Sequence, residues 1–499
     1  MDDFRQLLPL LLTFPLLKKS AEFVRVIWPA VLRIAEVYLR FQQPITPQAT
    51  YEFEQELMAA LRELGRVLLE WKYNHLEGDA ATQAPFVRYQ GVRYRWREKK
   101  GRHWVATLAG KIQLWAWIYE SPEPREPCIR PLDWCLGLQA GCATPALAEQ
   151  VGCWMNESGA SQRRVLRQLR KFCNVFWSAQ TLRNVTATLS DGLAMHRHAA
   201  QVAQLLKWLE QAHATAGPHR VTLSAGRDGY MVPMRGQKEH REASTATVTV
   251  LDRCGKRMGT VYLAQMPDLL QCMLSEQLTG LLRAVLEQWT GEWPELQYVT
   301  DGGFHATQYY QQVLSCWPDP RHRGRVLRWK WVVDFYHAAQ RIGDLGEALF
   351  RSPKERAVWV KEMLRRMRKR NGMRRVLLSA AAHYGRRRLS AVRREAYWEA
   401  YNYLSSRLQF LDYWSCKKRG MLIGSGITEA ACKMIGQRIK CSGMKWGLEG
   451  GQVILELMVL QRSQVWCAAF GAYLKSLPLP TPESRTSHPK RRSKAKKAA

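Results

Sequence analysis

Residues 215–340 constrain the fold most, because strand-like and helix-like segments alternate there in a fixed order. The segment "HRVTLSAGRDGYMVPM" has the composition of a strand, and "ASTATVTVLD" and "RMGTVYLAQM" form a predicted hairpin across "RCGK". A helix follows over "PDLLQCMLSEQLTGLLRAVLEQW", then a strand over "LQYVTDGG", a helix from about His305 and a strand over "RVLRWKWVVDFYH". The predicted order is therefore three strands, helix, strand, helix, strand.

This order is that of the ribonuclease H-like fold, and no other common α/β fold opens with two such hairpin connections before its first helix. We therefore predict an α/β ribonuclease H-like core whose first part spans residues 215–340. Helical patterns replace the strands from about Ala338 to Met421, which predicts an all-helical insertion over residues 341–423. The core is then expected to end over residues 424–470.

The N-terminal region is predicted to be mostly helical. Over residues 1–80, "AEFVRVIWPAVLRIAEVYLRF" has helical apolar spacing broken by Pro29, and "TPQATYEFEQELMAALRELGRVLLEW" opens with a Thr/Pro start signal. Residues 81–125 change to alternation from Val87 to Tyr119, with turn-like "KKGR" and "LAGK", which predicts a small antiparallel β region carrying Arg and Trp. The Pro-rich "SPEPREPCIRP" then marks a boundary.

Residues 126–214 are predicted to be helical and to resemble a helix-turn-helix. Helices are expected to begin at Thr144, Ser161 and Ser178, each a good N-cap residue. The third helix places an apolar side inward and leaves polar side chains outward, as a recognition helix needs in a major groove. An ordinary helical bundle explains the same pattern. The inward residues are Leu182, Val185, Thr186 and Leu189, and the outward ones are Gln180, Thr181, Arg183 and Asn184, of which Gln180, Arg183 and Asn184 are the predicted DNA contacts.

The charge of the chain points to a polyanionic partner. Lys and Arg number 75 against 43 Asp and Glu, a formal net charge of +32. Binding to phosphates is favourable because each neutralised phosphate releases condensed counterions, although such a surplus can also serve solubility. The surplus is clustered: Lys361–Glu395 holds 13 Lys and Arg against two acids, and Arg365, Arg366 and Arg368 are predicted to follow a nucleic-acid backbone. Residues 471–499 are expected to form a basic disordered tail.

Cysteines and apolar runs indicate the compartment. The twelve cysteines include no Cys-x-x-Cys pair and no Cys/His group at zinc-ligand spacing, so we expect reduced thiols. The run "LLPLLLTFPLL" is too short to span a bilayer and follows an acidic "MDDF". We therefore predict a cytoplasmic, nucleoid-associated protein without a membrane partner.

Candidate catalytic acids follow from the chemistry of phosphoryl transfer. Two divalent ions about 3.5 to 4 Å apart must flank one phosphate, so carboxylates have to converge from separate elements. Asp228 lies within or just past the first predicted strand, and Asp301 directly follows a short apolar strand and precedes two glycines. Both are predicted metal ligands at the carboxyl edge of the sheet. Taken singly, either aspartate could instead form a turn or cap a helix.

The third acid is expected on a helix after the sheet, where Glu429 stands behind "GSG" and opens a helix to about Ile439. A carboxylate flanked by lysines suits metal binding beside a phosphodiester, whereas a surface ion pair with Lys433 at i,i+4 is the alternative. At 100° per residue the predicted buried stripe is Ile427, Ala430, Ala431, Met434 and Ile435, opposite Glu429, Lys433, Gly436 and Lys440.

Residues around this helix are candidates for contact with DNA. Lys433, Arg438, Lys440 and Lys445 are predicted phosphate contacts. Trp446 is predicted to stack on an unpaired base or to pack in the core. Further upstream, Asp334 and His337 stand three residues apart at the end of the last strand, where they could bond to each other or to a ligand. A helix-capping aspartate and a core histidine explain that pair equally.

Four segments together resemble a known family. "GSGITEAACKMIGQRIKCSGMKW", "MVPMRG", "VTDGG" and "VVDFYHAA" are similar to segments of the DDE transposases of bacterial insertion sequences of the Kra type, which have a ribonuclease H-like catalytic domain. The resemblance covers about residues 215–460, "RPLDWCLGL" and the helical region after it. It implies a catalytic triad of Asp228, Asp301 and Glu429 that holds two Mg²⁺ or Mn²⁺ ions. It also implies that Asp334 and His337 form the Asp-x-x-His signature of such enzymes, as auxiliary residues.

The function that the resemblance implies is transposition. The protein would bind double-stranded DNA at the terminal inverted repeats of its own element, nick the ends with water, and use the freed 3′-hydroxyl to attack target DNA. A homodimer or higher oligomer on DNA is expected, because two ends must be brought together. Two rivals stay open: a nuclease that only hydrolyses DNA, and a non-catalytic DNA-binding regulator derived from a transposase.

Overall fold

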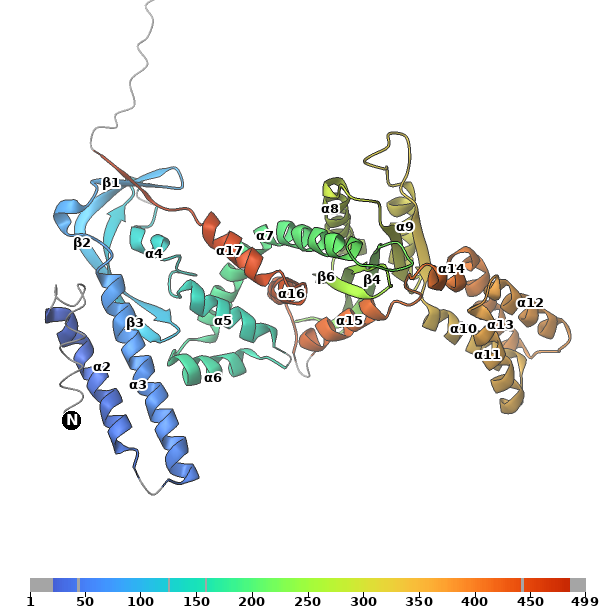
Figure 1. Cartoon of the computed structure of the whole chain (residues 1–499), viewed down its shortest axis with the longest axis horizontal. Coiled ribbons are helices and arrows are strands. Elements are labelled where there is room, and N and C mark those ends of the chain that lie inside the picture. The colour runs from blue at the N-terminus through green and yellow to red at the C-terminus, as the bar shows by residue number, and fades with distance from the viewer. Residues whose placement is uncertain (1–20, 43–44, 124–125, 158, 441–443, 485–499) are drawn as a thin grey trace, which may run out of the picture. The chain divides into compact units, whose positions relative to one another are not determined.

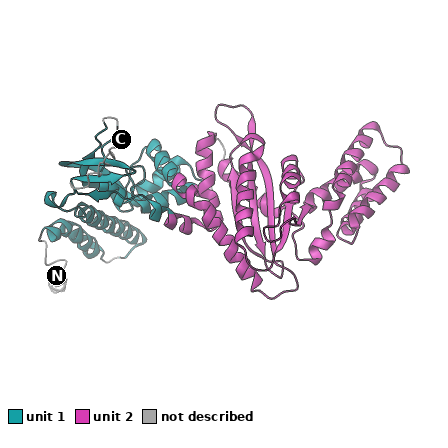
Figure 2. Ribbon diagram, turned by 90° about the horizontal axis from the view of Figure 1, so that it is seen from above, with its two compact units in different colours: residues 1–155, 160–189, 473–499 teal, residues 156–159, 190–472 magenta. Residues whose placement is uncertain are grey.

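The computed structural model of the chain describes residues 21–42, 45–123, 126–157, 159–440 and 444–484 (Figure 1). The chain divides into two compact units (Figure 2). Unit 1 holds residues 1–155, 160–189 and 473–499, and unit 2 holds residues 156–159 and 190–472. The apolar run at residues 7–17 and the basic tail beyond residue 484 lie outside the described residues.

Unit 1 begins with the two helices predicted for its N-terminal region, α2 (Ala21–Arg40) and α3 (Pro47–Asn74). Thr46 caps α3, since its side chain accepts a hydrogen bond from the backbone N–H of Ala49 at 3.1 Å. Pro47 occupies the first turn, where a backbone N–H has no partner within the helix. The predicted break at Pro29 is wrong: α2 continues through this proline, which removes only one backbone donor from a 20-residue helix.

A four-stranded antiparallel sheet follows, in the order β3-β2-β1-β9. Its strands are β1 (Phe86–Tyr89), β2 (Val92–Thr107), β3 (Gly110–Glu120) and β9 (Thr481–Glu483). The predicted turn at "LAGK" joins β2 to β3, but "KKGR" is not a turn. β2 runs through it, and the register with β3 shifts between Trp96 and Lys100, so the extra residues form an irregularity within one strand.

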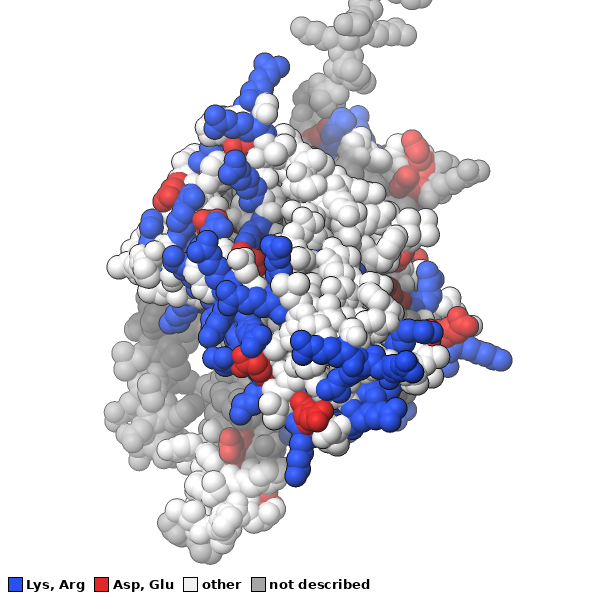
Figure 3. Space-filling model, turned by 90° about the vertical axis from the view of Figure 1, so that its right-hand side faces the viewer, with Lys and Arg blue, Asp and Glu red and all other residues white. Residues whose placement is uncertain are grey.

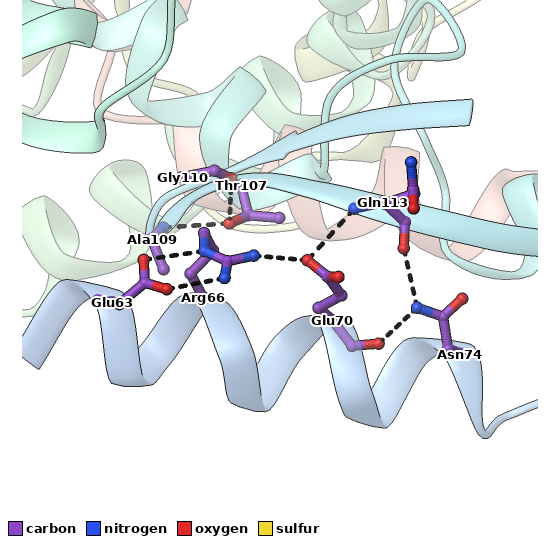
Figure 4. A network of polar contacts seen from close by, with 8 residues as sticks. All are labelled: Glu63, Arg66, Glu70, Asn74, Thr107, Ala109, Gly110 and Gln113. Atoms are coloured by element: carbon purple, nitrogen blue, oxygen red, sulfur yellow. Dashed lines mark hydrogen bonds and ion pairs between the residues drawn. The ribbon is translucent and has the colours of Figure 1, made fainter. Parts of the chain in front are cut away.

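Helix α3 closes the free edge of β3 (Figure 4). Glu70 accepts a hydrogen bond from the Gln113 N–H at 3.4 Å, and Asn74 donates to the Gln113 carbonyl at 2.8 Å. Asn74 also accepts from the Trp115 N–H at 2.7 Å. Arg66 holds Glu70 in place from the preceding turn of α3. Because these side chains occupy the backbone groups of an edge strand, that edge is protected from pairing with another chain.

The next helices are α4 (Pro131–Cys135), α5 (Pro145–Asn156), α6 (Gln162–Cys173) and α7 (Ala179–His213). The last three helices begin directly after Thr144, Ser161 and Ser178, the N-cap residues that predicted their starts. The inward side chains predicted for α7, namely Leu182, Val185, Thr186 and Leu189, are buried. With 35 residues, however, α7 is far longer than the short helix that was predicted, because the apolar pattern continues through the segment expected to precede the core.

Unit 2 contains a five-stranded mixed sheet in the order β6-β5-β4-β7-β8. The strands are β4 (Thr222–Pro233), β5 (His240–Leu251), β6 (Arg257–Gln265), β7 (Glu295–Thr300) and β8 (Trp329–Val333). β7 pairs in parallel with both β4 and β8, whereas β5 is antiparallel to both of its neighbours. Helices α8 (Cys272–Gln288) and α9 (Phe304–Gln312) fall between the strands, so the predicted order of strands and helices is confirmed.

Helices cover both faces of this sheet. Leu223, Ala225 and Val248 share a hydrophobic core with buried residues of α7 and α8. On the other face, α15 (Gly426–Ile439) packs on β4 and β5, and α16 (Leu448–Arg462) packs on β6. A side chain at Gly226 would place its Cβ 2.3 Å from Oγ1 of Thr428. The glycine therefore lets the first turn of α15 lie directly against β4.

Between β8 and α15 the chain is helical, as predicted. The helices are α10 (Phe335–Leu349), α11 (Pro353–Met367), α12 (Gly372–Gly385), α13 (Ala391–Ser406) and α14 (Tyr413–Lys418). Their buried residues, among them Trp359, Val376 and Tyr397, continue the hydrophobic core of the sheet.

The last helix, α17 (Trp466–Ser476), extends into the segment of residues 471–499 predicted as a disordered tail, and strand β9 lies within it, so the described part of that segment contains regular structure. No single helix among the described residues is long and apolar enough to cross a membrane, although α16 and α17, bent by 116°, together reach the length and composition of a span.

Candidate active site

Three aspartates lie at the same level on three adjacent strands of the unit 2 sheet. Gly226 of β4 pairs with Val299 of β7, so Asp228 and Asp301 each stand two residues beyond one register pair. Thr300 of β7 pairs with Val333 of β8, and Asp301 and Asp334 are the residues that follow. Adjacent strands are about 4.8 Å apart, so Asp228 in the middle of β4 lies level with Asp301 and Asp334, which directly follow the carboxyl ends of β7 and β8.

Asp228 lies on the face of β4 that is covered by α15. Its carboxylate accepts a hydrogen bond from the Gly229 N–H at 2.8 Å. Burial raises the pKa of the Asp228 carboxyl, and the negative charges of Asp301 and Glu429 act in the same direction. A proton or a cation at this site would therefore relieve the repulsion between the three acids.

Asp301 stands in a loop that is held by α13. Its side chain accepts a hydrogen bond from the Gly303 N–H at 2.9 Å, and its carbonyl accepts one from the Tyr403 hydroxyl at 2.7 Å. Arg407 donates to the carbonyl of Gly302 at 3.1 Å. Gly302 has a φ of +78°, a backbone conformation that glycine adopts without strain. The helical segment thus fixes the loop that carries the second predicted ligand.

Asp334 and His337 bond to each other, and Asp334 also caps α10. One oxygen of the completely buried Asp334 accepts from the His337 N–H at 2.8 Å and pairs with His337 Nδ1 at 3.0 Å. The other accepts from the Ser425 N–H at 2.6 Å. Burial alone would raise the pKa of Asp334, but the hydrogen bonds from His337 and Ser425 outweigh it and lower that pKa. The hydrogen bond to Asp334 raises the pKa of His337, and the charges of Asp301 and Glu429 add to the effect.

Glu429 lies in the first turn of α15, exposed, and accepts a hydrogen bond from the hydroxyl of Ser425. Among the residues that the structure describes, it makes no ion pair with Lys433, so the surface pair considered as an alternative does not form there. Thr428, next to Glu429, shares a hydrogen bond of 2.7 Å with Thr247 on β5. The start of the helix is therefore tied to the sheet, while the carboxylate of Glu429 remains open to a ligand.

The predicted stripe on α15 is partly wrong. Ala430 is exposed, and Ile427 and Met434 are only half-buried. The sheet presents Gly226, Asp228 and Tyr230 to this helix, so small and polar residues pack there in place of a continuous apolar stripe. The residues of α15 that are buried are Thr428, Ala431, Cys432, Ile435, Gly436, Arg438 and Ile439.

One group of side chains could hold a metal ion directly. Within the described ranges, ligand atoms of Asp334, His337 and Glu429 all lie within 4.8 Å of one another. Asp228 and Asp301 do not belong to this group, although their charges act on the same side chains. Asp334 already accepts three hydrogen bonds, so Glu429 and His337 are the members of this group that are more available to bind a metal ion.

A cavity of about 690 Å³ opens beside Asp301. Residues of α9, α10 and α13 line it, which brings two guanidinium groups and several side-chain amides next to the proposed metal ligand. Sequence patterns did not identify Tyr403 and Arg407, because they stand on a helix about 100 residues after Asp301 and carry no local motif. The cavity residues of greatest chemical interest are Phe304, Gln308, His337, Arg341, Tyr403 and Arg407.

The structure divides the predicted phosphate contacts near α15 into two groups. Lys433, Lys440 and Lys445 are exposed. Arg438 is buried, and its guanidinium lies 5.3 Å from the centre of the Trp446 ring, so it is less accessible to a phosphate than the three lysines. Trp446 is half-buried and donates a hydrogen bond to the Ile439 carbonyl at 2.6 Å, which favours the packing role over stacking on a base.

The helical segment carries the basic cluster at its surface. Figure 3 faces the end of unit 2 that bears α11 to α13, and Lys and Arg outnumber Asp and Glu there. Arg365 and Arg366 both pair with Glu362, and Arg368 lies over the ring of Phe335 at 4.8 Å.

In unit 1, the predicted DNA contacts on α7 are exposed and bonded to one another. Arg183 donates to Gln180 at 2.7 Å, and Gln180 donates to Asn184 at 2.7 Å.

Comparison with protein-family models and with curated protein sequences found no match for the chain.

Proposed function

We propose that the protein is the transposase of an insertion sequence and that unit 2 cuts and joins DNA by metal-assisted phosphoryl transfer. The observation that carries the proposal is the alignment of Asp228 and Asp301 at one level of neighbouring parallel strands, with Glu429 on the helix that covers this edge. Acids contributed by distant segments of the chain are what two-metal chemistry requires.

The architecture of the sheet supports a ribonuclease H-like core. Its five strands have the chain order 3-2-1-4-5, and only the second strand runs in the direction opposite to the other four. Ligands of open α/β sheets bind outside the carboxyl ends of the strands, which is where Asp301 and Asp334 stand, and Asp228 lies level with them within β4. The helical segment between β8 and α15 takes the place of the insertion in this proposal.

The donor set fits two Mg²⁺ or Mn²⁺ ions, because hard cations prefer carboxylate oxygens. Asp228, Asp301 and Glu429 would hold them, and the bound ions would supply activation of the attacking water or hydroxyl and stabilisation of the leaving 3′-oxygen. The raised pKa of Asp228 is consistent with a site whose acids repel one another until a cation binds.

Asp334 and His337 act beside these ligands. Because Nδ1 of His337 pairs with Asp334, its Nε2 is left for the cavity that His337 lines. Nε2 can there hold a proton close to the reacting phosphate, and the Asp334 carboxylate stabilises the charged imidazole. Asp334 also fixes Ser425, which in turn bonds to Glu429, so one buried carboxylate orients two residues of the site.

The partners follow from the charge. Double-stranded DNA of the terminal inverted repeats and of the target would lie along the basic surface of α11 to α13 and the exposed lysines of α15. A homodimer or higher oligomer on DNA would bring two ends together. The proposed location is the cytoplasm, at the nucleoid.

The deciding experiment is a strand-transfer assay with labelled duplexes that carry the terminal repeats flanking the gene. Mg²⁺-dependent joining to a target plasmid, lost in Asp301→Asn and Glu429→Gln, is the expected result. Hydrolysis without joined product would identify a nuclease instead. If both variants kept every activity of the parent in cells, the protein would be a non-catalytic regulator.

A further inference from the structure

Around Trp104 and Trp115, the hairpin of β2 and β3 in unit 1 has one buried and one exposed face, whereas further along β3 the residues Trp117 and Tyr119, on the same face as Trp115, are buried. Val105, Ile112, Leu114 and Ala116 form the core of the buried face, together with Leu132 of α4. Trp104 and Trp115 lie on the opposite face, where 50% and 44% of their surfaces are exposed. Two large apolar rings on the solvent side of a sheet bury no core, so their placement calls for another role.

The register of the hairpin brings the two tryptophans and two cations together. Arg102 is directly opposite Trp115, and Trp104 is directly opposite Gln113, so all four side chains share one face. Nζ of Lys111 lies 4.5 Å from the centre of the Trp104 ring, and the guanidinium of Arg102 lies 5.8 Å from that of Trp115. Each exposed ring therefore has its own cation.

Strand β2 as a whole has the positive charge that a polyanion-binding element needs. Strand β2 alone holds six Lys and Arg and a single acid, Glu98. Arg97 pairs with Glu120, but Arg102 and Lys111 make no ion pair within the described residues. Positive charge next to open aromatic rings is complementary to phosphates that are linked to flat bases.

We propose that this face of unit 1, formed by Arg102, Trp104, Lys111 and Trp115, binds single-stranded nucleic acid. Bases stack on the two indole rings, and Arg102 and Lys111 contact the phosphates beside them. The exposed lysine of the Lys111–Trp104 pair is flexible, so its ammonium can pass from the ring to a phosphate when a base stacks. This inference goes beyond the proposed chemistry, since it needs neither the acids of unit 2 nor a metal ion.

The geometry favours an unpaired strand over a duplex. Trp104 and Trp115 are diagonal neighbours across the hairpin, about 7–8 Å apart. Bases within one strand of a duplex rise by about 3.4 Å, and their faces are covered by the neighbouring pairs. An extended single strand exposes its base faces and can span the wider spacing, which is how sheets that carry surface aromatics hold RNA and DNA.

A peptide partner that adds a strand to the sheet does not fit at β3. Backbone groups of Gln113 are already bonded to Glu70 and Asn74 of α3 (Figure 4). The backbone N–H groups of Trp115 and Trp117 are bonded to Asn74 and to Glu77, in the turn after α3. Adding a strand there would require breaking these bonds. The face of the hairpin, and not its outer edge, is therefore the part that is open to a ligand.

The test measures binding of a fluorescent oligothymidylate to the full-length Asp301→Asn protein in EDTA, so that no cleavage intervenes. Trp104→Ala and Trp115→Ala should each weaken binding by about 5- to 150-fold, the loss of one stacked base. Trp104→Phe and Trp115→Phe should restore most of the affinity. Trp134→Ala, in α4, is the matched control and should bind as the parent does, because α4 contributes Leu132 to the buried face.

The outcomes are distinct from those of the strand-transfer assay. Affinity of the alanine variants within twofold of the parent would overturn the inference, as would an equal loss for a duplex of the same length, which would mark a duplex-binding surface. Should the alanine variants fail to fold, photocrosslinking of a 5-iodouracil oligonucleotide to the Asp301→Asn protein decides. Crosslinks at Trp104 or Trp115 support the proposal, and crosslinks confined to other segments refute it.

Discussion

Substitution of Gly226 tests whether the close packing of α15 on β4 positions Glu429 in the proposed site. Alanine at this position would place its Cβ 2.3 Å from Oγ1 of Thr428 and 3.0 Å from the carbonyl oxygen of Val299. An ordinary contact begins at 3.4 Å, so the first turn of α15 must move by about 1 Å. Overpacking of this kind costs about 1–3 kcal/mol. Because Glu429 follows Thr428 directly, a shift of about 1 Å in a reacting group is expected to lower the rate of cleavage by roughly 100-fold.

The assay pairs stability with single-turnover cleavage of a labelled repeat end. Gly226→Ala should lower the free energy of unfolding by about 1–3 kcal/mol in urea and slow cleavage, while DNA affinity is retained. Gly436→Ala is the matched control on the same helix, since its Cβ would meet Tyr230 at 3.5 Å, an ordinary contact. Removing the obstructing hydroxyl in Gly226→Ala/Thr428→Ala should recover part of both losses, although it also removes the hydrogen bond to Thr247.

The reasoning would be refuted by a folded Gly226→Ala protein that cleaves at the parental rate. It would equally be refuted if Gly436→Ala were as damaging as Gly226→Ala, because the effect would then not come from the contact with Thr428. A loss of stability without rescue in the double variant would assign the cost to the Val299 carbonyl instead.

Three further perturbations address the acids, the basic surface and the Asp334–His337 pair. Glu429→Ala should abolish Mg²⁺-dependent cleavage and leave DNA affinity equal or higher in filter binding, since one negative charge near phosphate is removed; a large loss of binding would mark Glu429 as structural. The double variant Arg374→Gln/Arg375→Gln should flatten the dependence of the DNA-binding constant on salt: the slope of its logarithm against log salt should fall by about 0.9 for each phosphate that is no longer neutralised. The double variant Arg365→Gln/Arg366→Gln should change this slope less, because both arginines already pair with Glu362. The hydrogen bond to Asp334 raises the pKa of His337, so its contribution to stability is full below pH of about 6.5 and is lost as the pH rises through the folded-state pKa. His337→Gln should therefore lose more stability, relative to the parent in urea melts, at about pH 6 than at about pH 9, and an equal loss at both would show that the pair is not charged.

Local sequence signals predicted the elements of the core because those signals act over a few residues. Caps at Thr46 and Ser161 start helices as expected, and each hydrogen-bonds a backbone N–H three residues on. Hydrophobic period and turn residues gave the order of strands in unit 2, and the strand ends at Asp301 and Asp334 placed two acids at the sheet edge. These features need no knowledge of what lies across the fold.

The errors arise where a distant segment decides the outcome. Apolar periodicity could not show that α15 would turn Thr428 and Cys432 to the sheet, since that choice depends on Gly226 and Asp228, about 200 residues earlier. The burial of Arg438 likewise depends on Trp446, whose backbone pairs with Pro233 and Arg235 at the end of β4. Charge and hydropathy describe a residue's own preference, and such long-range contacts override it.

Distant contacts also connect the candidate active site with the helical segment from α10 to α14. The Asp301 loop bonds to Tyr403, which follows 102 residues later, and Asp334 bonds to Ser425, 91 residues later. Helices α10 to α14 carry the chain from β8 back to α15, and Tyr403 lies on α13. The helical segment therefore contacts the site through Tyr403 and Arg407, which donate to the carbonyls of Asp301 and Gly302, and through Tyr413, whose hydroxyl donates to the carbonyls at the end of β8. The proposed catalytic edge and the basic helical surface are therefore joined by direct hydrogen bonds within unit 2.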